Sequence, residues 1–362
     1  MGLEIIKPDT NFDFLKFRKI GYAISAVIIL AGIVSIAAKG GLRYGVDFAG
    51  GLTIQMKFAK SMDVAEIKKA LDPVGLQGLV VQRFGQEGDN EYLARASGDD
   101  VTQEGVRADV DKTMKAAFPD SGFEMQRLEM VGPKVGADLR SKALEAIFYA
   151  VLLIAIYISG RFEQRWMAAG IMAGALAFIV YILHLLGAPT SYVIIALFGV
   201  TIILCWYLKL KFALGAVVAD IHDILMTIGI FSLMDKEFDL TIVAALLTIL
   251  GYSLNDTIIV FDRIRENLKE HGKNKTFQQV INESINQTLS RTILTSGTTL
   301  LVIVCLFLFG GGVIHDFALA MLIGIVTGTY SSIFVASPLL VDLGSGLPPR
   351  AEKPASVKEQ TA

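Results

Sequence analysis

Long apolar runs alternate with short polar stretches along most of the chain. The first run covers 20–38, directly after three basic residues. About a hundred residues of mixed character follow, and then seven more apolar runs at 143–160, 167–186, 192–208, 212–234, 240–261, 292–310 and 317–341. Because a helix of about 20 apolar residues crosses a bilayer, the pattern predicts about eight membrane-spanning helices and a polytopic α-helical membrane protein.

Residues 42–137, between the first two predicted spans, have a different pattern. Leu52, Ile54 and Met56 alternate with polar neighbours, which is typical of a half-buried strand. Asp63 is suited to begin a helix, a second helix is expected at 102–118, and further strands are expected at 78–84, 91–96 and 123–131. The order β-α-β-β-α-β predicts a small ferredoxin-like α+β domain. A binding or mechanical module is a simpler interpretation of this domain than a catalytic one.

The distribution of lysine and arginine predicts the orientation. If the N-terminus is cytoplasmic, the short outer loops hold only Lys236, whereas fourteen basic residues lie inside. These are Lys7, Lys16, Arg18, Lys19, Arg161, Arg165, Lys209, Lys211, Arg263, Arg265, Lys269, Lys273, Lys275 and Arg291. Inner loops carry the excess of basic residues, so both termini are expected in the cytoplasm. The expected order is an N-terminal segment (1–19), the first span (20–38), the outer domain (42–137), the bundle (143–341) with a cytoplasmic loop (262–291), and a disordered tail (342–362).

Composition narrows the class of protein further. Apolar residues make up 53% of the chain and charged residues 19%, below the roughly 25% of an average soluble domain, and the mean hydropathy is +0.55. These values exclude a water-soluble enzyme, and the net charge of −2 argues against a nucleic-acid-binding protein. Cys205 and Cys305 match no zinc spacing. The sequence therefore predicts no metal and no cofactor.

Ionisable residues inside predicted spans are costly and mark a pathway, a relay or a structural pair. Asp256 lies about 16 residues into its span, which is about 24 Å from the outer end at 1.5 Å per residue, with Asn255 beside it. Arg291 begins the next span, and we expect it at a similar depth. Burial favours the protonated carboxyl group and a nearby guanidinium favours the carboxylate. Relative movement of the two side chains would therefore bind and release a proton, although a static ion pair explains the same residues equally well.

A second polar cluster lies near the middle of the span at 212–234. Asp220 and Asp223 are three residues apart, so both can face the same neighbouring helix. His222 beside Asp223 could act with it as a proton relay. A polar contact between two helices is an equally good interpretation.

Four motifs occur in a fixed order along the chain. They are Gly45-Val46-Asp47-Phe48-Ala49-Gly50-Gly51, Val131-Gly132-Pro133-Lys134-Val135-Gly136, the stretch from Gly251-Tyr252-Ser253-Leu254-Asn255-Asp256-Thr257 to Phe261-Asp262-Arg263-Ile264-Arg265-Glu266, and Ser284-Ile285-Asn286-Gln287-Thr288-Leu289-Ser290-Arg291-Thr292. Together they resemble the motifs of the SecF family, membrane subunits of protein export that belong to the RND superfamily.

The resemblance implies a function that composition alone does not. It implies an accessory subunit of the Sec protein translocase in the bacterial inner membrane, with an RND-type half bundle and a periplasmic domain. Such a subunit works with SecD, near YajC and the SecYEG channel, and uses the proton gradient to promote translocation and release of preproteins. ATP hydrolysis belongs to SecA, so no enzymatic activity of its own is implied.

The resemblance also implies roles for particular residues. It implies a role in proton coupling for Asp256 and Arg291, and the family pattern matches His222-Asp223 but not Asp220. Asp47, Phe48, Gly50 and Gly51 carry the motif that begins the periplasmic domain.

One feature departs from the family. SecF chains usually have six spans, with an Arg-Phe-Glu stretch leading directly into a Phe-Ala stretch. Here the two stretches, at 161–165 and 212–216, are separated by about 45 residues that hold an extra pair of spans, at about 167–210. Two added crossings leave the sidedness of later spans unchanged. Lipid-facing accessory helices are the simplest interpretation, and an added docking surface is the alternative.

Two other classes of protein were compared with this interpretation. A proton antiporter subunit of the RND type, for a small molecule or lipid, generally needs two six-span halves and large outer domains. An intramembrane aspartyl protease using Asp223 and Asp256 would need a Gly-x-Gly-Asp context, which is missing before Asp256.

The predicted topology can be tested by labelling of single cysteines. A cysteine introduced at Pro189 or Lys236 should react with an impermeant reagent from outside, and one at Lys273 only from inside. Labelling of position 189 from the cytoplasm would contradict the eight-span arrangement.

Overall fold

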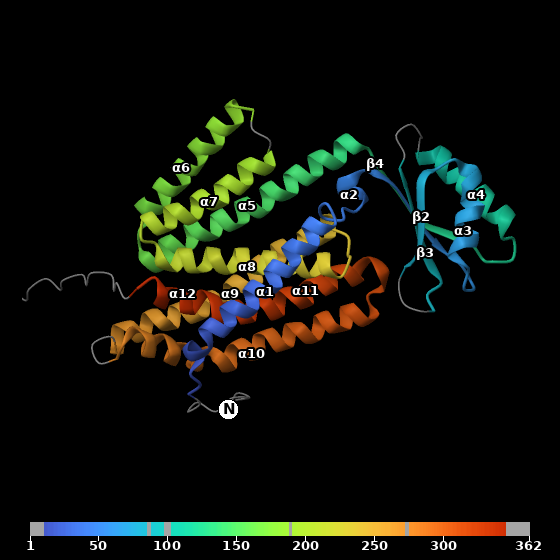
Figure 1. Ribbon diagram of the computed structural model, residues 1–362. Coiled ribbons are helices and arrows are strands. Elements are labelled where there is room, and N and C mark those ends of the chain that lie inside the picture. Colours follow the sequence, from blue (N-terminus) through green and yellow to red (C-terminus); the bar gives the residue numbers. More distant parts are fainter. Residues whose placement is uncertain (1–10, 85–87, 98–102, 188–189, 272–274, 345–362) are drawn as a thin grey trace, which may run out of the picture.

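The computed structural model describes residues 11–84, 88–97, 103–187, 190–271 and 275–344 (Figure 1). Positions 189 and 273, used in the labelling test, and nearly all of the tail lie outside the described residues. Long helices form one bundle, and a four-stranded sheet lies beyond one end of it (Figure 1). The two parts have separate apolar cores. The predicted polytopic helical protein with a small sheet domain is therefore confirmed.

The bundle consists of long apolar helices. After the short 3₁₀ turn η1 (Phe14–Phe17), they are α1 (Arg18–Ala38), α5 (Pro133–Glu163), α6 (Trp166–Leu185), α7 (Thr190–Tyr207), α8 (Lys211–Leu233), α9 (Leu240–His271), α10 (Phe277–Phe309) and α11 (Gly311–Ser331), which continues through the π-helical turn η3 (Ser332–Ala336) into α12 (Ser337–Asp342). Among the described residues, seven helices are long and apolar enough to span a membrane. The span expected at 192–208 corresponds to a shorter apolar helix.

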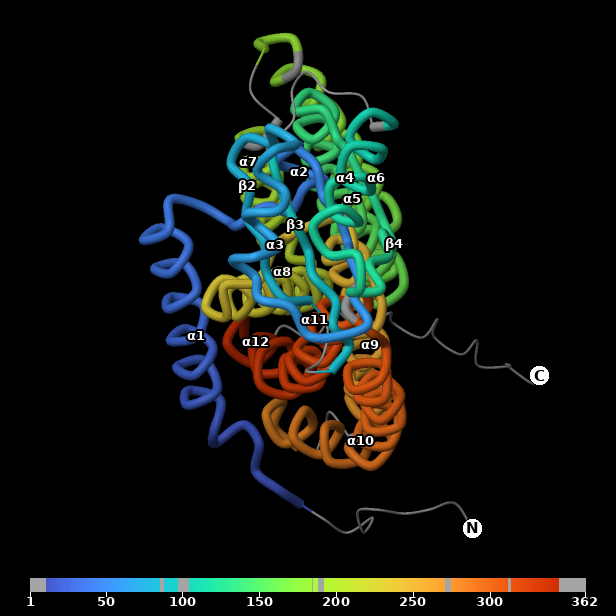
Figure 2. Tube along the Cα trace, turned by 90° about the vertical axis from the view of Figure 1, so that its right-hand side faces the viewer, coloured from blue at the N-terminus to red at the C-terminus, as the bar shows by residue number. Residues whose placement is uncertain are grey.

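Helix α8 is the centre of the bundle. It packs against α1, α5, α7, α9 and α11, and 72% of its most apolar window is buried, more than in any other candidate span of the described chain. Figure 2 shows α1 along one edge of the bundle and α10 along another. Polar side chains on α8 are therefore surrounded by protein on several sides.

Several helices are longer than their apolar runs. The segment 262–291, expected as a loop, is helical from 262 to 271 as the end of α9 and from 277 onward as the start of α10. The length of an apolar run indicates only the part of a helix that can lie in the hydrocarbon core of a membrane. Polar ends of the same helix extend beyond that core, into water or against other parts of the protein. The π-helical turn η3 was not predicted either, because single-turn π-bulges leave no hydrophobic period of their own.

The extra pair of helices lies at the periphery. Helices α6 and α7 pack against each other and against α5, on the side away from α10 (Figure 1). Large apolar side chains on α6 are exposed, including Trp166, Met167 and Phe178. Such a face suits contact with lipid.

The sheet domain has the predicted order of elements. They are β1 (Gly51–Lys57), α3 (Val64–Leu71), the 3₁₀ turn η2 (Asp72–Val74), β2 (Gln77–Phe84), β3 (Glu91–Ser97), α4 (Gln103–Ala117) and β4 (Glu124–Val131). The sheet order is β2-β3-β1-β4, and all the paired strands are antiparallel. Ile54, Met56 and Tyr92 of the sheet are buried against Ile67 of α3 and Val110 of α4. This is the ferredoxin-like arrangement expected from the sequence.

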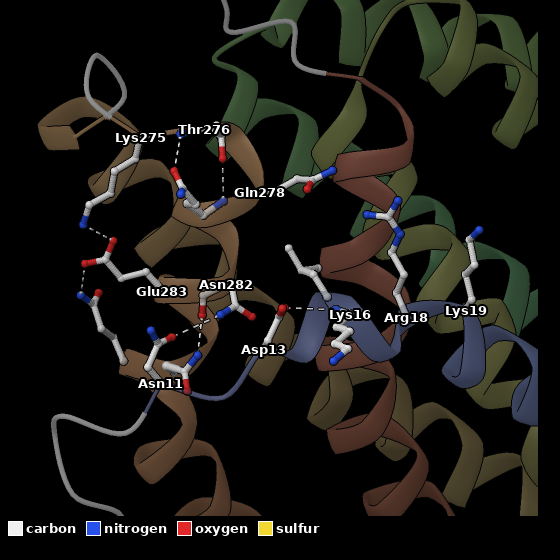
Figure 3. A pocket seen from close by; sticks show the side chains of 14 residues that line it. Asn11, Asp13, Lys16, Arg18, Lys19, Lys275, Thr276, Gln278, Asn282 and Glu283 are labelled. Atoms are coloured by element: carbon white, nitrogen blue, oxygen red, sulfur yellow. Dashed lines mark hydrogen bonds and ion pairs between the residues drawn. The ribbon is translucent and has the colours of Figure 1, made fainter.

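The N-terminal segment is bound to α10 through two asparagines one helical turn apart. Asn286 Oδ1 accepts from Phe12 N (2.9 Å), and Asn282 Oδ1 accepts from Phe14 N (2.9 Å). Both side-chain amides also donate to the Phe12 carbonyl oxygen. Figure 3 shows Asn11 and Asn282 side by side in the polar groove formed there by η1 and α10. The start of α1 is thereby tied to the helix that carries Arg291.

Small residues allow α9 and α11 to pack closely. A Cβ atom built on Gly324 would lie 2.2 Å from Ile249 Cγ1, and one on Gly328 would lie 2.8 Å from Ser253 Cβ. These distances are too short for any larger residue without displacement. The GxxxG spacing of α11 therefore brings Ser253 of α9 into the centre of the bundle.

Gly328→Ala should destabilise the bundle. The added methyl group must displace Ser253 or separate the helices, and overpacking of this kind costs about 1–3 kcal/mol. Thermal unfolding of the purified protein in detergent should show a lower midpoint. Gly174→Ala on α6 is the matched control, because a Cβ at Gly174 meets nothing within 4 Å. Equal midpoints for the two variants would contradict the close packing.

Candidate functional site

Asp223 of α8 is the most enclosed carboxylate of the bundle, with 0% exposure. Its Oδ2 accepts hydrogen bonds from Ser253 Oγ of α9 (2.6 Å) and from Ser331 Oγ of α11 (2.9 Å). Its Oδ1 lies 2.9 Å from His222 Nδ1. Three helices thus contribute to one polar centre.

The hydrogen bonds of Ser25 and Tyr330 determine which ring nitrogen of His222 acts as a donor. Tyr330 OH donates to the Gly21 carbonyl oxygen (2.6 Å), which leaves Tyr330 only as an acceptor for Ser25 Oγ (3.2 Å). The single hydroxyl proton of Ser25 is then used, so His222 Nε2, 2.8 Å away, must donate to Ser25 Oγ. Nδ1 and the carboxylate consequently share one further proton: either His222 is an imidazolium beside a carboxylate, or Asp223 is protonated beside a neutral imidazole. A contact of this length allows a proton to lie on either side chain.

Asp256 of α9 occupies a second polar centre, with 2% exposure. Its Oδ2 accepts from Ser296 Oγ of α10 (3.1 Å), and Ser296 Oγ accepts in turn from Thr329 Oγ1 of α11 (2.7 Å). Thr329 and Ser331 lie within the same turn of α11, on either side of Tyr330. One turn of α11 therefore contacts both carboxylate centres: Asp223 directly through Ser331, and Asp256 through Thr329 and Ser296.

Arg291 and Asn255 lie at the edge of this second centre. Arg291 is close enough to Asp256 to attract it electrostatically, but its side chain is exposed, and no ion pair joins the two in the part of the chain that the structure describes. Asn255 is exposed on the outer side of α9. The static ion pair, one of the two interpretations of the sequence, is not formed between these two side chains among the described residues.

The motif at 45–51 joins the sheet domain to the bundle. Asp47 lies in the short helix α2 (Val46–Ala49), and its Oδ2 accepts from Leu240 N at the start of α9 (3.1 Å). Phe48 is buried against Tyr44 and Phe238. Gly50 and Gly51 both have positive φ angles, and a Cβ on Gly50 would lie 2.8 Å from Pro133 Cα. The two glycines permit a turn that passes directly against the first residue of α5.

The connection between α8 and α9 is also bonded to the sheet domain. Gly45 N donates to the Phe238 carbonyl oxygen (3.0 Å), and Phe238 N donates to that of Arg43 (2.8 Å). Glu237 forms ion pairs with Arg43 and with Arg95 of β3. Asp235 forms ion pairs with Lys39 and Arg43, and the hydrogen bond and charge of Lys39 together with the charge of Arg43 hold the pKa of this carboxyl group below its ordinary value.

The hydroxyl groups around the carboxylates were not predicted from the sequence. Ser253, Ser331 and Ser296 bond to a carboxylate directly, whereas Thr329 bonds to Ser296, Ser25 to His222, and Tyr330 to Ser25. A usable signal was the run of hydroxyl residues at 327–332 inside an otherwise apolar span. Hydroxyl side chains are common in membrane helices, however, and only the packing shows which of them point toward a carboxylate.

Two family models match this chain. The model described as "Protein export membrane protein SecD/SecF, C-terminal" matches residues 110–189 and 184–346, and that of the "SecD/SecF GG Motif" matches 34–62. Among curated proteins, the protein translocase subunit SecF of Magnetococcus marinus is 42% identical over 364 residues, covering 99% of this chain and 100% of the relative. That of Vibrio alginolyticus is 39% identical, covering 97% and 96%.

Solved structures show the same likeness. The crystal structure of SecDF, a translocon-associated membrane protein from Thermus thermophilus, matches with a TM-score of 0.67 and 29% identity over 94% of this chain. SecDF in its super-membrane-facing form matches with a TM-score of 0.55 and 29% identity. This chain spans 39% of the length of either SecDF chain.

Replacement of Asp223 should show how much the polar centre contributes to stability. Asp223→Leu leaves the donors of Ser253, Ser331 and His222 without an acceptor, and breaking a buried charged network costs about 3–5 kcal/mol. Asp223→Asn keeps a carbonyl oxygen for both serines, so it should cost less. Thermal unfolding in detergent should rank wild type above asparagine above leucine. Equal midpoints for the two variants would show that the hydrogen bonds to the serines contribute nothing.

Proposed function

The chain belongs to the SecF family of protein translocase subunits, and we propose that it uses protons crossing the membrane to move its sheet domain during protein export. Membership makes it an accessory subunit of the Sec protein translocase. The curated relatives named protein translocase subunit SecF match this chain over nearly its whole length. The proposal concerns how the subunit works.

One observation carries the proposal: two carboxylates lie inside an apolar bundle with hydroxyl groups, rather than lysine or arginine, bonded to them. Asp223 contacts two serines and His222, and Asp256 contacts Ser296. A carboxylate held by neutral donors gains or loses its charge without breaking an ion pair. Such groups suit reversible proton binding better than a permanent structural contact.

Proton binding changes the hydrogen bonds between helices. A carboxylate accepts from Ser253 of α9 and Ser331 of α11 at one oxygen, whereas a protonated carboxyl group also needs an acceptor for its own hydrogen. Protonation of Asp223 or Asp256 therefore favours a different relative position of α8, α9 and α11. A proton gradient would therefore drive the movement of these helices between the two positions.

The outer ends of the same helices transmit this change to the sheet domain. The connection between α8 and α9 is bonded to Arg43 and Gly45, and Glu237 within it pairs with Arg95 of β3. Helix α5 follows β4 after a single residue, Gly132. A shift of α8 and α9 would therefore pull on the base of the sheet, which in this proposal engages the exported chain.

The proposal includes the partners and location that the family implies. SecD is the expected partner, and the likeness to SecDF chains of which this chain spans 39% supports this. The exposed Asn255 and Arg291 lie where a partner's helices could cover them. YajC, the SecYEG channel, SecA and preprotein substrates complete the expected surroundings. The chain would lie in the bacterial inner membrane, with its sheet domain in the periplasm and both termini in the cytoplasm.

Two other functions receive less support. A proton antiporter subunit for a small molecule or lipid is not favoured, because the relatives matched over their full length are translocase subunits. We assign no catalytic activity to the chain, and in this proposal Asp223 and Asp256 carry protons and do not cleave peptides.

Asp256→Asn tests the proton-carrying role. Asparagine keeps the size and the acceptor for Ser296 but cannot release a proton, so the protein should assemble normally and lose the gradient-dependent part of export. Export of a Sec substrate into membrane vesicles, with and without a proton gradient, is compared after normalising to the amount of assembled complex.

Asp262→Asn provides the control on the same helix. Asp262 is exposed and pairs with Arg161, and loss of such a surface pair costs only about 0–1 kcal/mol. Export with this variant should keep its dependence on the gradient. Undiminished gradient-dependent export by well-assembled Asp256→Asn protein would rule out the role of Asp256.

A further inference from the structure

Asp220 is a third buried carboxyl group of the bundle. It lies on α8 with 2% exposure, one helical turn before Asp223. Its Oδ2 atom is fully enclosed and has no hydrogen-bond partner within the described parts of the chain. Neither the polar centre around Asp223 nor that around Asp256 includes it.

The surroundings of Asp223 and Asp220 differ in their hydrogen-bond donors, which decide whether a buried carboxyl group is ionised. Three donors surround the Asp223 carboxylate: Ser253, Ser331 and, through its imidazole, His222. Among the described residues, Asp220 has no such set of donors. An ionised carboxylate buried without hydrogen bonds or a cation costs several kcal/mol, and such a group instead keeps its proton.

No cation balances a second negative charge here. Close to this part of α8 lie His222 and Asp223 on α8 itself and Tyr330 of α11, whose ring stacks on that of His222, while α1 contributes the hydroxyl of Ser25. In the residues that the structure describes, neither Asp220 nor Asp223 forms an ion pair with lysine or arginine. Two carboxylates one turn apart, with one imidazole between them in sequence, cannot both remain charged at low cost.

We propose that Asp220 is a proton-holding carboxyl group that supplies the Asp223–His222 pair. In the resting state Asp220 carries its proton and Asp223 is the acceptor. In the transfer step the O–H bond of Asp220 breaks, Asp223 gains the proton, and the negative charge moves to Asp220. Asp223 then releases its proton toward one side of the membrane, and a proton taken up by Asp220 from the other side restores the first state. This inference rests on the proposed proton coupling, to which it adds a second carrier one turn from the first.

Infrared spectroscopy tests the protonation directly and without any transport. The full chain, reconstituted in lipid vesicles, is titrated across neutral pH while the carbonyl band of protonated carboxylic acids is followed. Wild type should show such a band at neutral pH, and the difference from Asp220→Asn should isolate one carboxyl group. Asp220→Glu should shift this band without removing it, which also serves if the asparagine variant folds poorly. Asp256→Asn should leave it in place.

The infrared result has two outcomes. A band that responds to Asp220→Asn and Asp220→Glu as described supports the proposal. An unchanged band in both variants, or no band in wild type at neutral pH, overturns it. Because no export is measured, these outcomes hold whether or not Asp256 proves to carry protons.

Gradient-dependent export tests the transfer to Asp223. Asp220→Asn should lower the gradient-stimulated part of export several-fold and shift its dependence on pH, while export without a gradient stays unchanged. Asp220→Glu should restore most of the stimulation. If the infrared band belongs to Asp220 but Asp220→Asn exports like wild type at every pH, the proton is resident and the supply role is wrong.

Discussion

The bundle depends on keeping negative charge inside an apolar environment without lysine or arginine bonded to it. Burying an isolated carboxylate costs far more than one hydrogen bond returns, so each such group needs donors or its proton. Asp223 has hydroxyl donors from two helices and shares a proton with His222, and Asp256 has Ser296. In the proposed mechanism these neutral donors let each carboxyl group change its protonation state, whereas an ion pair with arginine would favour the ionised state alone.

Close helix packing is what makes these short hydroxyl side chains sufficient. A serine Oγ extends only one bond beyond Cβ, so Ser253 and Ser331 reach the same carboxylate oxygen only where backbones approach closely. Gly324 and Gly328 permit this approach between α11 and α9. Gly32 and Gly229 do the same where α1 crosses α8, since a Cβ on Gly32 would lie 2.4 Å from Gly229 Cα. The glycines at these two helix crossings thus bring Ser253 and Ser331 within hydrogen-bond distance of Asp223.

The sequence predicted the parts of this structure that follow from periodicity. Alternation around Ile54, the capping residue Asp63 and the strand and helix patterns that follow them up to residue 131 predicted the ferredoxin-like order, and apolar run length located the long helices. Asp256 and Asp223 stood out because charge is rare in such runs. The hydroxyl partners could not be predicted, because Ser331 differs from other serines only in what packs opposite to it. Nor could the exposure of Arg291 be predicted, since its distance from Asp256 depends on how α10 is rotated.

The short connection between α8 and α9 links the helices that carry the carboxylates to the sheet domain. Helices α8 and α9 carry Asp223 and Asp256, and the short connection between their outer ends is bonded to Arg43, Gly45 and Arg95. Asp47 adds a bond from the other side, to the first turn of α9. In the proposed mechanism, a change in how α8 and α9 lie against each other would therefore displace the residues to which the sheet domain is bonded. The added helices α6 and α7 both pack against α5, and α7 also packs against α8, so the extra pair contacts one of the two helices that carry the carboxylates and does so from the periphery of the bundle.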